Sequence, residues 1–386
     1  MQTHWADILD RAITFRHLLH RHPELTWQEE QTAKKIRAAL DDLSIAWRSC
    51  AQHGTVATLA PKAKGEHIAL RADIDALPIE EHSEHSFRSE NKGCMHACGH
   101  DGHSAALWAA AAWLKTQEEK LAGPASLIFQ PAEEGGHGAR EMIADGALDG
   151  VDKIFGWHNW PAIPFGRAVC PDGPVMSGNG TFDIVVQGQG GHASQPELCR
   201  NPVTAAAAIT INLQQIINQR IAPQDAAVVV ITSIDAPSGP TIIPASAKLC
   251  GGIRISRSEL RIEINNLIRQ ISEDTARAYG VSATVDIQPR YEATVNHAGA
   301  AQHYRNCLRR EFGETWRLDS LPLPIMASED FSYYLNEIPG AYALIGTAVD
   351  QQFNIPCHSA HYQFNDDVIA PVARIYSHLV GVDPPI

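Results

Sequence analysis

HSAALWAAAAWLK at residues 103–115, followed by ASLIF at residues 125–129, is the pair of segments that decides the fold class. The alanine-rich run is typical of a helix, and the short apolar run is typical of a buried strand. Outward from this pair, we expect strands at residues 54–60, 67–72 and 153–156, and helices at 5–20, 27–43 and 139–145. Strands that alternate with helices in this way predict an α/β domain with a largely parallel sheet.

The pattern changes near residues 177–180. Strands are then expected at residues 181–187, 226–234, 248–255 and 282–288, and helices at 202–220 and 257–279. This β-α-β-β-α-β order is typical of the ferredoxin-like arrangement. We therefore expect a discontinuous main α/β domain, residues 1–177 and 291–386, with a ferredoxin-like α+β domain inserted at residues 178–290.

Composition narrows the classes of protein that fit. The chain has 386 residues, of which 44% are hydrophobic and 19% charged, a globular balance that favours two domains. Its net charge of −13 argues against binding to nucleic acid or to an anionic membrane. There is no apolar run long enough to span a bilayer and no pattern of a secretory signal, and the eight scattered cysteines favour reduced thiols. We expect a cytoplasmic protein.

The densest chemical cluster is MHACGHDGH at residues 95–103, immediately before the alanine-rich helix. Cys98 and His100 lie two residues apart in a glycine-containing loop, so both side chains can reach one ion. Thiolate and imidazole together suit zinc and other transition metals. A helix start with a buried cysteine and a few surface histidines is the structural alternative.

Carboxylates form the next two clusters. Glu133 and Glu134 follow an apolar strand directly, and one could bind a cation while the other moves protons, although a solvated acidic turn has the same sequence. Asp73 and Asp75 occupy alternate positions at another strand end, where Asp75 could orient a metal-bound histidine. An ordinary strand-to-turn pair is the alternative for these aspartates.

Three separate histidines complete the set of candidates. His158 is expected at the end of a strand, His358 lies in the segment CHSAH, and His192 belongs to the inserted domain. Each one alone is more often structural than functional. Histidines and carboxylates recur together after the apolar runs of the main domain, and this recurrence indicates a functional site.

The segment GQGGHA at residues 188–193 fits the G-x-G-x-x-A pattern of dinucleotide-binding loops. Pro196 and Pro202 come before the next helix, so that helix does not begin where a pyrophosphate would need its N-terminus. A nicotinamide enzyme is therefore only a third alternative.

Together these motifs resemble the M20 metallopeptidase/amidohydrolase family, specifically its subgroup of N-acyl-amino-acid deacylases, hippurate hydrolases and auxin-conjugate hydrolases. The matching stretches are residues 20–25 (HRHPEL), 71–78, 95–103, 130–135, 157–158, 191–193, 328–331 and 339–342. They run in order over nearly the whole chain, which makes the resemblance specific to the subgroup.

The resemblance implies two divalent transition-metal ions per subunit, which could be zinc, manganese, cobalt or nickel. Their implied ligands are Cys98, His100, Glu134, His158 and His358, with the cysteine in a bridging position that related peptidases fill with aspartate. Glu133 matches the general base and Asp75 the residue that orients a ligand. His192 is expected to reach the active site of a partner subunit and to polarise the scissile carbonyl, which implies a homodimer formed through the inserted lid and dimerisation domain.

The chain also departs from the family pattern. Relatives usually carry Asn-Val-Ile-Pro where this chain has TIIP at residues 241–244, so Thr241 removes an amide expected near the substrate's carboxyl end. The usual Gly-Thr-x-Arg is GGIR at residues 251–254, which keeps Arg254 as a carboxylate clamp. The metal and base positions are all intact, which argues against an inactive homologue.

The function predicted on this basis is hydrolysis of a small N-acyl-L-amino acid, with an acetyl or aroyl group, by a hydroxide held between two metals. A dipeptidase or carboxypeptidase on the same site is the alternative within enzymes. A non-catalytic metal-binding or amino-acid-binding protein is the alternative of another class, although pure binding would not need Glu133.

Overall fold

Residues 4–385 are described by the computed structural model, and their contacts divide the chain into two units. The first unit holds the residues up to Val175, together with Val295–Pro322 and the chain from Asp330 onward. The second unit holds Met176–Thr294 and Leu323–Glu329. The segment expected as an inserted domain, residues 178–290, lies inside the second unit, which also takes in a short return segment that the sequence analysis did not assign to it.

A seven-stranded sheet in the order β1-β2-β4-β3-β5-β15-β6 forms the centre of the first unit. The neighbours β4-β3, β3-β5 and β5-β15 pair in parallel, while β1, β2 and β6 pair antiparallel at the two edges. The strands are β1 (Trp47–Cys50), β2 (Gly54–Leu59), β3 (Ile68–Asp73), β4 (Ala125–Gln130), β5 (Lys153–Pro164), β6 (Ala168–Val169) and β15 (Gly340–Ala348). Two further strands, β7 (Gly173–Met176) and β14 (Thr294–Asn296), pair where the chain passes between the units.

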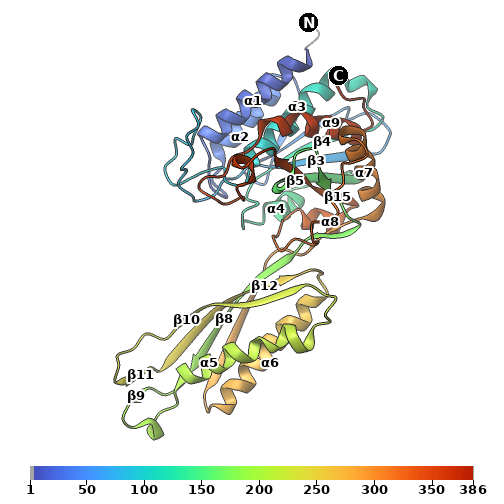
Figure 1. Ribbon diagram of the computed structural model, residues 1–386. Coiled ribbons are helices and arrows are strands. Elements are labelled where there is room, and N and C mark those ends of the chain that lie inside the picture. Colours follow the sequence, from blue (N-terminus) through green and yellow to red (C-terminus); the bar gives the residue numbers. More distant parts are fainter. Residues whose placement is uncertain (1–3, 386) are drawn as a thin grey trace. The chain divides into compact units, whose positions relative to one another are not determined.

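Helices cover this sheet. They are α1 (Trp5–Arg21), α2 (Glu30–Asp41), α3 (His100–Thr116), α4 (Gly138–Ala144), α7 (Ala298–Phe312), α8 (Ser332–Glu337) and α9 (Ile369–Leu379), with short 3-10 turns at Glu118–Lys120, Gln352–Asn354 and Asp366–Val368. Helix α3 packs against α1, α9 and β3, and α4 packs against α8 (Figure 1). The sheet edge formed by the carboxyl ends of the parallel strands is where an α/β fold places its polar site.

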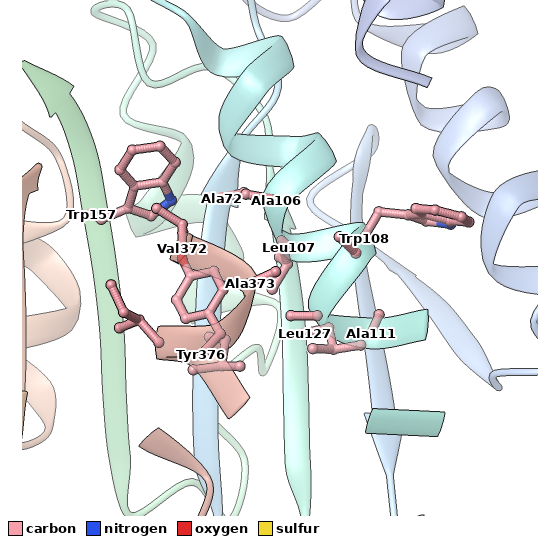
Figure 2. Close-up of a cluster of buried hydrophobic side chains, with 14 of the residues drawn as sticks. Ala72, Ala106, Leu107, Trp108, Ala111, Leu127, Trp157, Val372, Ala373 and Tyr376 are labelled. Carbon is pink, nitrogen blue, oxygen red and sulfur yellow. The ribbon is translucent and has the colours of Figure 1, made fainter. Parts of the chain in front are cut away.

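The core of the first unit lies between the sheet and α3 with α9 (Figure 2). Small side chains such as Ala106 and Ala111 allow α3 to approach the strands closely, and Leu107 and Leu127 fill the space between them. Fourteen of the seventeen residues of α3 are buried, so this helix is enclosed on nearly all of its faces. A helix enclosed in this way is a rigid support for the residues at its N-terminus.

The second unit has a four-stranded antiparallel sheet in the order β10-β12-β8-β13, with α5 and α6 on one face (Figure 1). The elements are β8 (Gly178–Gln187), α5 (Pro202–Leu213), β10 (Ala227–Asp235), β12 (Ser246–Ile255), α6 (Leu260–Ala278) and β13 (Ser282–Pro289). A small ribbon of β9 (Gly191–His192) and β11 (Ile242–Ile243), a 3-10 turn at Pro196–Leu198 and a π-helical turn at Ile216–Arg220 complete it. This order is the ferredoxin-like arrangement.

Three expectations about element boundaries were wrong. Strand β5 continues to Pro164 because β15 pairs with it up to that residue, so His158 lies within the strand instead of ending it. Helix α2 begins only at Glu30, since Trp27 has a left-handed φ of 62° that a helix cannot include. The helix expected at residues 202–220 ends at Leu213 and is followed by the separate π-helical turn.

Two other expectations can be compared with this architecture. Between residues 4 and 385, no helix combines the length and apolar character needed to cross a membrane. The glycine-rich segment at residues 188–193 contains β9 and is followed by a 3-10 turn, and α5 begins only at Pro202. Its backbone therefore does not run directly into a helix N-terminus, as a dinucleotide-binding loop does.

Candidate metal centre

A left-handed glycine shapes the loop that presents Cys98 and His100. Gly99 has a φ of 86° and stands at the N-cap of α3. A Cβ there would lie 2.6 Å from both the Asn159 Nδ2 and the Tyr362 hydroxyl, so any other residue would be strained and would clash. The cysteine and histidine on either side are buried.

Asn159, which the sequence analysis did not single out, locks this loop from behind. Its Nδ2 donates to the Cys98 carbonyl oxygen at 2.6 Å, and its Oδ1 accepts from the Tyr362 hydroxyl at 2.6 Å. Its backbone N–H donates to His103 Nε2 at 3.1 Å, while His103 Nδ1 lies 2.6 Å from Asp73 Oδ1. Because both ring nitrogens of His103 are engaged, this histidine of the MHACGHDGH cluster has a structural role.

Asp75 connects the loop to the Glu133–Glu134 turn. His100 Nδ1 lies 2.9 Å from the Asp75 carbonyl oxygen and 3.3 Å from its Oδ1. The other carboxylate oxygen, Oδ2, accepts from the Glu134 backbone N–H and from the Thr26 hydroxyl, both at 2.9 Å. The buried carboxylate of Asp75 therefore orients the imidazole of His100 and the backbone of Glu134, both of which are candidate ligands.

The five side chains expected to bind metal lie together in the first unit. Donor atoms of Cys98, His100 and His158 lie within 4.8 Å of one another, and so do those of Cys98, Glu134 and His358. Cys98 Sγ is 3.4 Å from His158 Nε2, and Glu134 Oε1 is 3.2 Å from His358 Nε2. The two triads share the cysteine, as a ligand placed between two ions would require.

The chemistry of these donors fits transition-metal ions. His100 Nε2 is buried and has no hydrogen-bond partner in the part of the chain that the structure describes, although Asp73 Oδ2 lies 3.7 Å away. A thiolate, imidazoles and a carboxylate form a set that suits such ions. Burial lowers the pKa of His100, but the Asp73 and Asp75 carboxylates outweigh this effect and raise it to about 10. A bound cation would take over the neutralising role of that proton.

The protonation of the Cys98 thiol should also depend on whether a cation is bound. A contact with the Cys357 thiol and burial together hold the pKa of Cys98 well above its usual range. Metal binding must therefore release a proton from this cysteine, and affinity for the ion should rise with pH.

Glu133 lies beside the donor cluster on a strained turn. It is buried, and its Oε1 accepts from the Asp330 backbone N–H at 3.3 Å. The preceding residue, Ala132, has a left-handed φ of 57°. Donor atoms of Glu133, Glu134 and His100 also lie within 4.8 Å of one another. A carboxylate in this position can exchange protons with a water held at the centre.

The remaining two candidates belong to the second unit. His192 is exposed on β9, where its Nδ1 lies 2.8 Å from the Ser194 hydroxyl and accepts from the Ser194 backbone N–H. Arg254 is half-buried on β12 and donates to the Ser328 hydroxyl at 2.6 Å. Neither residue belongs to the groups of donor atoms described above.

Comparison with known proteins identifies relatives of this chain. The model of the peptidase family M20/M25/M40 matches residues 69–381, which include the candidate ligands, the whole second unit and most of the first. The chain is 34% identical to the IAA-amino acid hydrolase ILR1-like 2 of Arabidopsis thaliana, over 97% of this chain and 85% of the relative. It is 36% identical to an N-acetyl-L-cysteine deacetylase of Bacillus subtilis, over 90% of this chain and 82% of the relative.

A solved structure has the same fold. A dinuclear metal-binding peptidase of Bacillus subtilis matches with a TM-score of 0.85 and 31% identity, over 97% of this chain and 98% of that one. The chain therefore shares its fold with a dinuclear metal-binding peptidase of this family.

Proposed function

Because this chain belongs to the peptidase family M20/M25/M40, we propose that it is a metal-dependent amidohydrolase that releases the acyl group from a small N-acyl-L-amino acid. The observation that carries the proposal is the pair of donor triads that share Cys98, with the buried Glu133 beside them. The similarity to an IAA-amino acid hydrolase and to an N-acetyl-L-cysteine deacetylase supports this substrate class.

Cys98, His100, Glu134, His158 and His358 would hold two divalent transition-metal ions. When bound, such ions lower the pKa of water and polarise a carbonyl group. Zinc, manganese, cobalt and nickel all suit the donors, since thiolate favours soft ions and carboxylate accepts harder ones.

Glu133 would move the proton in this reaction. Its carboxylate takes a proton from the attacking water, which raises the water's nucleophilicity towards the amide carbonyl. The same group then returns the proton to the departing nitrogen, so that the free amino acid leaves as a neutral amine. Burial keeps bulk water from competing for this proton.

Two residues of the second unit would handle the substrate. Arg254, held by Ser328, would bind the carboxylate of the amino-acid part through paired N–H donors. His192 would act in a homodimer, where it donates a hydrogen bond to the scissile carbonyl oxygen in the site of the other subunit. The exposed position of His192 and the exposed apolar residues of the edge strand β10, Val228 and Val230, support a dimer built on this unit.

The test is a hydrolysis screen on the metal-reconstituted protein. N-acetyl and N-benzoyl amino acids are assayed beside unblocked dipeptides, with and without a chelator. We expect chelator-sensitive release of amine from the N-acyl set. Cleavage of dipeptides alone would move the protein to the peptidases, and no cleavage with two metals bound would favour a binding protein.

One substitution tests the role of the base. Glu133→Ala should keep both metals while kcat falls by roughly two to four decades. Glu141→Ala is the control, because this half-exposed carboxylate lies on the adjacent α4 and contacts only Arg140 in the described chain. An active Glu133→Ala enzyme would refute the assignment.

A further inference from the structure

A second buried acid lies behind the Glu133–Glu134 turn. Glu29, in the loop before α2, is completely buried. Its Oε1 accepts from the backbone N–H of Ala132 at 2.9 Å and from that of Trp27 at 3.0 Å. Its Oε2 is buried and has no hydrogen-bond partner within the described part of the chain. Such a group needs an explanation, because an unsatisfied buried polar atom is costly.

The two N–H groups that donate hydrogen bonds to Glu29 belong to residues with a strained backbone conformation. Ala132 has a φ of 57° and Trp27 a φ of 62°, and neither is a glycine. Residues with side chains adopt this left-handed conformation only where the surroundings hold them in it. Ala132 directly precedes Glu133. The backbone conformation of Ala132 therefore determines the position and direction from which the Glu133 side chain projects.

Other contacts join the same two segments. The Trp27 Nε1–H donates to the Gly136 carbonyl oxygen at 3.0 Å, and the Thr26 hydroxyl lies 3.3 Å from the Glu134 carbonyl oxygen. A Cβ on Gly136 would come within 2.5 Å of Thr26 Cγ2, so the turn packs tightly on this segment. Residues 26–29 therefore hold the turn 132–136 at both of its ends.

We propose that Glu29 is a positioning residue, which holds Ala132 in its left-handed conformation so that Glu133 and Glu134 point into the metal centre. The inference rests on the proposed roles of Glu133 as the base and Glu134 as a ligand. Glu29 acts through the backbone and does not touch the reacting atoms.

The protonation of Glu29 bears on which side chains could replace it at this position. Burial, and secondarily the charge of Asp75, raises the pKa of Glu29 to about 8. Burial thus favours the uncharged acid, and in either form Oε1 is the acceptor of the two N–H groups. A glutamine offers the same acceptor at the same distance, whereas methionine has a similar volume and accepts no comparable hydrogen bond.

The test compares Glu29→Gln and Glu29→Met with the wild type, each checked for folding by circular dichroism. Three quantities are measured: kcat, KM, and the affinity for Co²⁺ from its ligand-field absorption in the metal-free protein. Glu29→Met should lower kcat and Co²⁺ affinity by about 10- to 100-fold with little change in KM, the scale found when a group behind a metal ligand is removed. Glu29→Gln should stay within about threefold of the wild type.

Glu24→Ala is the matched control. The Glu24 carboxylate accepts from the backbone N–H groups of Gln31 and Thr32, so it supports the start of the same helix without touching the turn. This variant should lose stability while kcat and Co²⁺ affinity are kept. Equal losses in Glu24→Ala and Glu29→Met would reduce Glu29 to a structural role and overturn the inference.

The remaining outcomes separate the inference from the function on which it rests. If Glu29→Met keeps the kcat and Co²⁺ affinity of the wild type, the inference is overturned. An inactive Glu133→Ala enzyme would still support the role of Glu133 as the general base. A large loss in Glu29→Gln would also overturn it, even if Glu29→Met does not fold, because the acceptor is preserved there. An active Glu133→Ala enzyme would instead remove the proposed function itself.

Discussion

His100 Nδ1 lies 2.9 Å from the carbonyl oxygen of Asp75 and 3.3 Å from its Oδ1, so two oxygens of one residue orient this imidazole. These contacts keep a proton on Nδ1, so that Nε2 is the nitrogen left to bind an ion once its own proton has been released. Metal affinity should therefore depend on Asp75 even though this residue is not one of the expected ligands.

We expect Asp75→Ala to weaken metal binding by about 10- to 100-fold, because the imidazole of His100 loses its carboxylate partner and the Glu134 N–H its acceptor. Competition with a chromophoric chelator would measure the change. Asp319→Ala, at an exposed carboxylate, is the control. Unchanged affinity in Asp75→Ala would contradict the orienting role.

The shared position of Cys98 in both triads allows a second prediction. Cys98→Asp should still bind two ions, because a carboxylate can also bridge, but its preference should shift from zinc and cobalt towards manganese. Cys98→Ala should lose at least one ion per chain. Metal content after dialysis against equal mixtures of the ions would measure both effects, and two retained ions in Cys98→Ala would argue against a bridging ligand.

A mixing experiment tests whether His192 acts across a dimer. His192→Ala and Glu133→Ala homodimers should each be nearly inactive. If subunits exchange at random, half of the dimers are mixed and each has one intact site, so about one quarter of wild-type activity should return. Activity of the mixture is compared with the two separate proteins at equal concentration. No recovery, despite subunit exchange shown by differently tagged chains, would place His192 in its own subunit's site or outside catalysis.

Stability should vary with pH through His20, which lies 2.9 Å from Asp101 Oδ2 and 3.2 Å from Glu81 Oε1. Burial lowers the pKa of His20, but Asp101 and Glu81 outweigh this and raise it to about 8 from an ordinary 6.5. A raised pKa in the folded state stabilises the protein fully below pH 6.5, and this contribution disappears as the pH rises through about 8.

The variant His20→Gln should therefore lose about 2 kcal/mol of this contribution below pH 6.5, and the loss should shrink between pH 6.5 and 8. Urea unfolding of the metal-free proteins at a series of pH values would measure it, since removing the metal removes its own pH dependence. His361→Gln, at an exposed position, is the control. A difference that does not change with pH would contradict the charged pair.

Local patterns were enough to predict most of the elements and the residue types of the centre. The Ala-rich run became α3, and the β-α-β-β-α-β order of the second unit is visible in its alternating segments. The cluster around Cys98 and His100 could be singled out because candidate metal ligands near a helix start leave a dense signal in the sequence. Asn159 directly follows His158, but an asparagine has no distinctive pattern, and its role was missed.

Residue types and order along the chain, read together with the family motifs, determined by themselves that this protein is an α/β hydrolase, and they predicted a metal centre that includes Cys98. Only the tertiary structure showed what His103 does, since both of its ring nitrogens contact residues distant in the sequence, Asp73 and Asn159. It alone revealed Glu29, which is separated from Ala132 by about a hundred residues. A hydrogen bond between distant segments depends on how the sheet and helices pack, and that packing leaves no periodic signal in the chain.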